Sequence, residues 1–399
     1  MIVSARRIDH LRLQLARMAS WALLVSAWLA LGALGYRHLP LWAGGMLPLA
    51  LWLTCMAGCM RLALTVLPRL RMSMAIAVPG WVCAGALWWV QKGGGGLAVL
   101  VAAVAWAPLL VAASSTVRQL RPRERSASPL WPVTLGLLMG GVASHELVLG
   151  AGSANGTAAL AWVAAVLLVA LRSISTSRPV AGPSSACRQG LFDCSLPLPI
   201  LPAASGGLTA TTVSARPMNW DEFLSIHAAR WAMLPMMATL PTMTAWCAAS
   251  ATGTTEPSLL LAMHLGAMVA PAWLMRALTR LGWQPRAAPT SAALLIAGGV
   301  VLLLGQSLRS LMLTTLLHTA AWSVAWELGL RQRRDPQPMP VRAVTLFALA
   351  APLCLLLLGC TTAALGPQTL TWVHLMLALF GLLSCWPWFA GKLQLSPLN

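Results

Sequence analysis

Charged side chains are scarce in this sequence, and acidic ones are nearly missing. The 399 residues include only 9 Asp and Glu, and charged residues make up 9% of the chain, against roughly 25% in a soluble globular domain. The sequence also lacks a Gly-rich phosphate loop, a zinc-ligand spacing, paired catalytic carboxylates and a cleavable signal peptide. These absences argue against a soluble globule and against an enzyme, and they lead us to expect no bound cofactor.

Long apolar runs take the place of the missing charge. Hydrophobic residues make up 58% of the chain and the mean hydropathy is +0.74. Runs of about 20 apolar residues can cross about 30 Å of hydrocarbon as helices. The sequence therefore predicts an all-α polytopic membrane protein, with the lipid bilayer as its main surroundings. We expect twelve transmembrane helices at residues 18–36, 40–60, 72–91, 95–115, 130–150, 154–171, 226–250, 257–275, 289–308, 310–330, 343–365 and 368–390.

The basic residues support that count and give an orientation. With a basic tail at residues 1–17 in the cytoplasm, 23 of the 27 Lys and Arg fall in inner segments, three in outer segments and one inside a span. This distribution follows the positive-inside rule. It predicts both termini in the cytoplasm and very short outer loops. It also explains the net charge of +18 without a nucleic-acid partner.

The spans divide into two six-helix halves. The N-terminal half is expected at residues 1–171 and the C-terminal half at 226–399. A cytoplasmic linker at 172–225, rich in Ser, Pro, Ala and Gly, separates them.

Two spacings of soft metal ligands stand out in neighbouring spans. Met233 and Met237 lie four residues apart in the seventh span, and His264 and Met268 do so in the eighth. Residues four apart share one face of a helix, and thioether and imidazole groups suit Cu(I). Both pairs are expected near the middle of the bilayer, where transporters hold substrate. The alternative is ordinary packing, because a chain with 19 Met has such pairs by chance.

Other residues are accessory candidates for a cation path. An ionisable group inside a span is costly unless it is paired or functional. His374 is instead expected to be a packed, hydrogen-bonded residue, and packing is the alternative for the cysteine pair. The accessory candidates are Cys247, His318, Cys55, Cys59, His145 and Glu146.

The layout resembles the major facilitator superfamily. The loop after the second span keeps Gly58, Arg61, Arg69 and Arg71 of the motif found there in that superfamily, but it has no Asp and no second Gly. The loop after the eighth span keeps Arg276, Arg280 and Gly282, again without an acid. The resemblance implies a carrier with a central cavity lined by the first, fourth, seventh and tenth helices, which include His318.

Within that superfamily, the seventh and eighth spans resemble those of CcoA-like copper importers. Those proteins carry Met-x-x-x-Met in the seventh helix and His-x-x-x-Met in the eighth, as Met233/Met237 and His264/Met268 do here. The resemblance implies Cu(I) import by alternating access, with copper as the substrate. A carrier of an organic solute or drug and a non-transporting membrane assembly factor are the alternatives. The Ala-, Leu- and Arg-rich composition is typical of a bacterial inner-membrane protein.

Overall fold

The part of the chain that the structure describes consists of long helices. A computed structural model describes residues 2–40, 46–65, 72–120, 130–149, 239, 255–282, 287–305, 307–332, 341–366 and 368–393. These residues contain helices and no β-strand. The first five helices along the chain are α1 (Ile2–His38), α2 (Met46–Thr65), α3 (Met72–Gln91), α4 (Gly95–Leu120) and α5 (Trp131–Leu149). The later ones are α9 (Thr255–Arg280), α10 (Ala287–Leu304), α11 (Leu308–Gln332), α12 (Val341–Leu365) and α13 (Gln368–Leu393).

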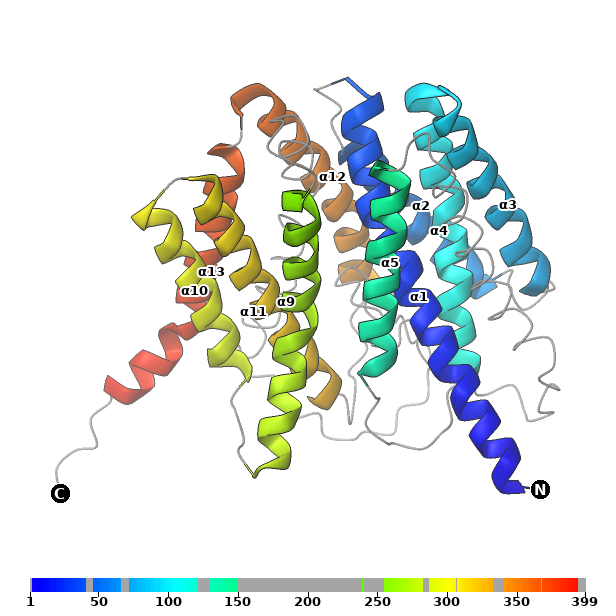
Figure 1. Ribbon diagram of the computed structural model, residues 1–399. Coiled ribbons are helices and arrows are strands. Elements are labelled where there is room, and N and C mark those ends of the chain that lie inside the picture. Colours follow the sequence, from blue (N-terminus) through cyan, green and yellow to red (C-terminus); the bar gives the residue numbers. More distant parts are fainter. Residues whose placement is uncertain are drawn as a thin grey trace. The chain divides into compact units, whose positions relative to one another are not determined.

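Ten of the twelve predicted spans coincide with these described helices (Figure 1). The sixth and seventh spans, residues 154–171 and 226–250, fall outside the described residues except for Thr239. The count of twelve and the cytoplasmic termini therefore remain predictions. Two stretches, Leu13–His38 and Leu261–Arg280, are each long and apolar enough to cross a membrane, and shorter apolar stretches lie in seven of the other described helices.

The first helix corrects the expected basic tail. α1 already begins at Ile2, and Leu13 and Arg17 on it are buried. The reason lies in the sequence before residue 18, where Leu, Arg, Ala and Gln favour helix and no Gly or Pro interrupts it. The basic residues in this stretch therefore extend the first apolar helix instead of forming a separate tail.

Very short connections join three pairs of helices. Only residues 92–94 separate α3 from α4, residues 305–307 separate α10 from α11, and residues 366–367 separate α12 from α13. Gly93 has φ +90° and Gly366 has φ +78°, which a residue with a Cβ rarely adopts. These turns agree with the prediction that alternate loops are very short.

One compact unit contains α1 to α5 together with α12 as far as Ala363. Within it α1 packs against α5, α4 and α2, while α4 also contacts α2 and α3. α12 reaches α2, since a Cβ at Gly359 would lie 2.8 Å from Cβ of Met46. This unit is thus assembled from parts far apart in the sequence. The division into six-helix halves at residues 1–171 and 226–399 is not tested by this unit and stays a prediction.

The other compact unit contains Thr239, α9 from Leu259, α10, α11 and α13. α10 packs against both α11 and α13. Leu295, Ala321 and Leu377 form one core cluster between these three helices. Met275 of α9 and Val324 of α11 form a second, and Leu294 packs against both.

Large apolar side chains also cover outward faces of the described helices. On α3, Trp81 is 79% exposed, and Val78, Trp88 and Trp89 are exposed as well. α10 and α13 likewise expose Leu303, Leu304 and Trp372. Soluble monomers rarely expose apolar surface on this scale. The pattern matches helices whose outer faces contact lipid.

The contact between α10 and α13 gives a first testable prediction. A Cβ at Gly381 would lie 2.9 Å from Cβ of Leu295 and 3.3 Å from the Ala292 carbonyl oxygen. We expect Gly381→Ala to cost about 1–3 kcal/mol by overpacking, and therefore to lower the melting temperature of the purified protein by about 1–4 °C. Gly266→Ala on α9 is the control, because nothing lies within 4 Å of that position. Equal melting temperatures for the two variants would contradict the prediction.

Candidate functional site

α9 carries the one predicted ligand pair that the structure describes. His264 and Met268 are both buried, with exposed fractions of 0% and 3%. The buried face continues one turn further to Ala272 and then to Met275, whereas Met263 is 46% exposed. The i, i+4 spacing thus places the imidazole and the thioether together on the inner face of the helix. Their role as metal ligands remains a prediction.

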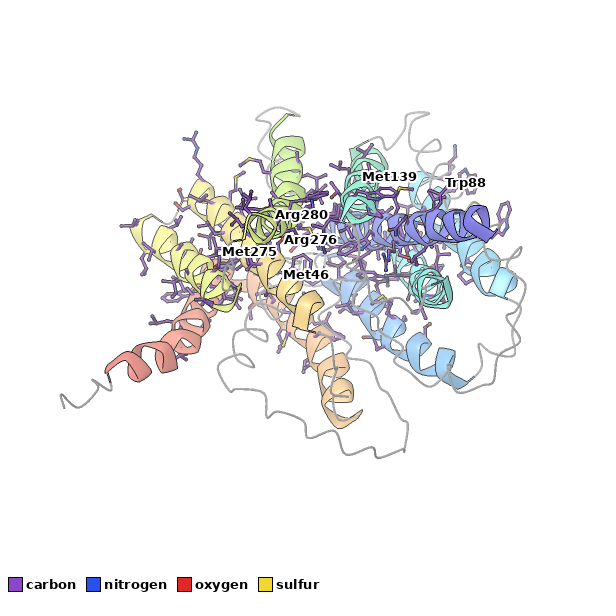
Figure 2. The ribbon with its side chains drawn as sticks, turned by 90° about the horizontal axis from the view of Figure 1, so that it is seen from below. Met46, Trp88, Met139, Met275, Arg276 and Arg280 are labelled. Atoms are coloured by element: carbon purple, nitrogen blue, oxygen red, sulfur yellow. The ribbon has the colours of Figure 1, made fainter. Side chains whose placement is uncertain are left out.

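The C-terminal end of α9 is basic. Met275, Arg276 and Arg280 lie close together at this end (Figure 2). Basic side chains in a last turn interact favourably with the negative end of the helix dipole. Gly282, with φ +86°, lies two residues beyond Arg280 in the turn that ends the helix. The glycine predicted as a remnant of a loop motif therefore has a structural role at this turn.

The partner pair of the predicted metal site lies outside the described residues. Met233, Met237 and Cys247 all fall in this part of the chain. That the seventh and eighth predicted spans bind one ion together accordingly stays a prediction. No group of three or more His, Cys, Asp or Glu side chains that could hold a metal ion occurs among the residues that the structure describes.

A hydrogen bond to α11 orients His264. Its Nδ1 lies 3.3 Å from Oγ1 of Thr319. That hydroxyl already donates to the Thr315 carbonyl oxygen at 2.7 Å, so it can only accept from the imidazole. His264 therefore carries its proton on Nδ1 and its lone pair on Nε2. This is the arrangement of a metal-binding histidine, whose other ring nitrogen donates to an oriented acceptor.

His318 and His374 bind each other inside the same unit. Their Nδ1 atoms are 2.8 Å apart, their ring centroids are 4.9 Å apart, and both side chains are fully buried. His318 Nε2 lies 3.1 Å from the Leu295 carbonyl oxygen, and His374 Nε2 lies 3.1 Å from Oγ1 of Thr239. This hydrogen-bonded chain connects α10, α11, α13 and the segment that contains Thr239.

A glycine makes room for this histidine pair. A Cβ at Gly298 of α10 would lie 2.5 Å from Nε2 of His318 and 3.2 Å from Cγ2 of Thr314. The Gly298 carbonyl oxygen accepts a 2.9 Å hydrogen bond from Oγ1 of Thr314. α10 and α11 thus approach closely at this level, and the imidazole occupies the space that a side chain on α10 would fill.

The remaining accessory candidates lie elsewhere in the chain. Cys55 and Cys59 are half-buried free thiols on α2, in the other unit. His145 and Glu146 belong to the last turns of α5, and their side chains are not among those the structure describes. A role of these four residues in a cation path therefore stays a prediction.

Two polar contacts were missed by sequence reasoning. The pairing of His318 with His374 was not predicted, although the expectation that His374 is packed and hydrogen-bonded is confirmed. Thr319 and Thr239 were not singled out either. The available signal was a run of threonines at 314, 315 and 319 that surrounds a histidine within an apolar helix.

Comparisons with known proteins identify the fold. No protein-family model matches the chain, and no curated protein matches its sequence. The crystal structure of the nucleoside transporter NupG is similar, with a TM-score of 0.55 and 14% identity over 98% of this chain and 100% of that one. The human organic anion transporter MFSD10 (TETRAN) is similar with a TM-score of 0.51 and 16% identity, over 95% of this chain and 97% of that one.

These two structures define the class of fold. One is a nucleoside transporter and the other an organic anion transporter, and the similarity covers nearly all of each chain. The chain thus shares the helical fold of these two structures, in agreement with the all-α architecture predicted from its sequence. At 14% and 16% identity the similarity shows the fold alone, and it does not identify a cargo or the copper-importer branch.

Proposed function

We propose that this protein is a secondary transporter that moves a small solute or ion across a membrane by alternating access. The observation that carries the proposal is structural similarity to two transporters over 95% or more of the chain. A second support is the set of buried histidines inside an otherwise apolar unit, because intramembrane ionisable residues mark substrate and ion pathways. The bacterial inner membrane remains the proposed location.

Copper(I) is the cargo that the ligand chemistry supports. His264 and Met268 lie on one buried face, and the bond from His264 Nδ1 to Thr319 leaves the Nε2 lone pair as the coordinating one. Soft, neutral ligands bind Cu(I) and discriminate against Mg²⁺ and Ca²⁺, which require oxygen. Met233 and Met237 would complete the set in this proposal, with import as the direction.

An organic solute is the second candidate cargo. It is supported by the structural relatives, which are transporters of nucleosides and of organic anions. In that case Met268 would be a packing residue. An apolar side chain of similar size without sulfur, such as Leu, could then replace Met268 without loss of transport.

Uptake by intact cells tests the proposal. Cells with and without this protein are supplied with copper, nickel, uridine or an organic anion, and accumulation is compared. A copper difference of about tenfold or more, the loss typical when metal coordination is disturbed, supports copper import. A difference confined to uridine or the organic anion supports the second candidate. No difference for any compound, in either direction, contradicts the transport function and favours the non-transporting assembly factor.

A further inference from the structure

We propose that the His318–His374 pair is a proton-binding site that couples transport to a proton gradient. The inference rests on the proposed transport function and adds the coupling ion to it. The pair lies entirely within one compact unit and is fully buried. Its hydrogen-bonded chain runs from Oγ1 of Thr239 through His374 and His318 to the Leu295 carbonyl oxygen.

Hydrogen-bond directions in the neutral pair follow from the Leu295 end. A carbonyl oxygen can only accept, so Nε2 of His318 carries a proton and donates. A neutral His318 then has its lone pair on Nδ1, and Nδ1 of His374 must donate to it. Nε2 of His374 is left as an acceptor, which receives the hydroxyl proton of Thr239. Every donor in the neutral chain thus points from Thr239 toward Leu295.

The same chain accommodates one additional proton without losing a contact. When a proton is added to Nε2 of His374, that nitrogen becomes a donor and Thr239 becomes the acceptor. The pair then carries one positive charge, and the proton between the two Nδ1 atoms at 2.8 Å is shared by both rings. No electron is transferred, and the proton added on loading is the proton lost on release. The site therefore has two states that differ in one proton and in the role of Thr239.

The nearest titratable group on α9 is His264, which contacts Thr319, the residue after His318. Arg276 lies twelve residues further along α9, about 18 Å at the helical rise. α10 contains no titratable residue between Ala287 and Leu304. The acidic residue of α9, Glu256, lies eight residues before His264, about 12 Å at the helical rise. These two helices thus contribute one further imidazole near the pair, and their carboxylate lies more than two turns from that imidazole.

α11 and α13 place their charged residues far from the pair. On α11, Arg309 and Glu327 each lie nine residues from His318, about 14 Å along the helix. On α13, Lys392 lies eighteen residues from His374, about 27 Å away. Thr239 is the one residue of its own segment that the structure describes. Along α11 and α13 no carboxylate lies within two turns of the pair, so imidazoles are the groups of the described helices close enough to take up the proton, and His318 and His374 are the two that are joined directly.

Burial links protonation of the pair to the transport cycle. A charge within an apolar interior is costly, so a charged pair is favoured only when it is hydrated or close to a counter-charge. A transporter that alternately opens to each side hydrates its interior from each side in turn. The pair would gain its proton on one side and lose it on the other, and the free energy of the gradient would enter the cycle at this site.

Nitrogen NMR of the full-length protein in lipid vesicles tests proton binding directly. With ¹⁵N-labelled histidine, the signals of the pair are identified by their loss in His318→Gln and His374→Asn. At about pH 8 we expect His374 protonated on Nδ1 and His318 on Nε2, and one further proton on the pair as the pH is lowered to about 3, with both signals changing together. A pair that stays neutral over this range overturns the proposal, whatever the protein transports.

Vesicle transport measurements test coupling. The cargo found in the cell assay is measured in two modes, accumulation driven by an imposed proton gradient and gradient-free exchange. His318→Gln keeps a donor for the Leu295 carbonyl, and His374→Asn keeps one at the position of Nδ1, but neither takes up a proton. We expect the ratio of driven accumulation to exchange to fall about tenfold or more in both variants, within the usual range of coupling between sites.

Thr314→Val is the matched control. It removes the hydrogen bond from α11 to the Gly298 carbonyl oxygen but leaves the histidine chain intact. An unchanged ratio in this variant, with a reduced ratio in the two histidine variants, supports the proposal. An equal reduction in all three variants means that the histidines only hold the helices together, and overturns it. A wild-type protein that exchanges cargo but ignores the gradient also overturns it, whereas one that moves no cargo in either mode removes the transport function itself.

Discussion

Double substitution of Gly136 and Gly140 by Ala is expected to disrupt the packing of α5 against α1. A Cβ at Gly136 would lie 2.5 Å from the Met18 carbonyl oxygen, and one at Gly140 would lie 2.5 Å from the Ala22 carbonyl oxygen. Both obstacles are backbone atoms, so no rotamer change can relieve them. The two glycines form a small-x-x-x-small pattern that lets two helix backbones approach closely.

The expected effect is large because both contacts fall on the same pair of helices. Each added methyl group costs about 1–3 kcal/mol by overpacking, and the two together should lower the melting temperature by roughly 2–7 °C. The measurement is thermal unfolding of the purified protein in detergent, combined with its elution profile. Gly85→Ala on α3 is the control, since nothing lies within 4 Å of that glycine. Its stability should be unchanged or slightly higher, because Ala favours helix over Gly. A double variant as stable as wild type would show that the two helices are not held this closely.

Replacement of Met268 by Leu is expected to abolish copper uptake without affecting folding. Leu conserves most of the volume and apolar character of the buried side chain, so the core should tolerate it at a cost below about 1.5 kcal/mol. It removes the sulfur, however, and with it one proposed ligand of Cu(I). We expect copper accumulation to fall about tenfold or more, with the amount of protein in the membrane unchanged.

Met263→Leu is a control on the same helix. Met263 is 46% exposed and lies away from the buried face, so copper uptake should not change. The double replacement of Met233 and His264 by Ala should also abolish uptake if the two predicted pairs share one ion. Normal copper uptake by Met268→Leu and by the double variant would show that these residues do not bind the transported copper, and would contradict the proposed site.

The positions of the described helices were predictable from the sequence because a bilayer imposes a minimum length of apolar chain. α3 begins and ends where it was predicted, at Met72 and Gln91. Ends that run past the apolar stretch were less predictable. α4 continues to Leu120 and α9 to Arg280, because polar residues that favour helix can continue it beyond the hydrocarbon.

The site was only partly accessible from the sequence. The common buried face of His264 and Met268 follows from helical periodicity alone. The contact between His318 and His374 does not, since the two residues are 56 positions apart. It depends on how α11 and α13 are rotated about their axes and on the absence of a side chain at Gly298. Neither rotation is encoded in a local spacing, so the hydrogen bond between the two histidines was not predictable, and the place of His318 in a cavity stays a prediction.

The compact unit that unites α1 to α5 with α12 has a consequence for biosynthesis. Its part of α12 reaches Ala363, far along the chain from α1 to α5. The ribosome must therefore synthesise more than 300 residues after Met46 before Gly359 can pack against it and the bundle can close. During that interval the surface of α2 that later packs against α12 stays uncovered. Uncovered packing surfaces of this kind are bound by chaperones and by membrane quality-control proteases.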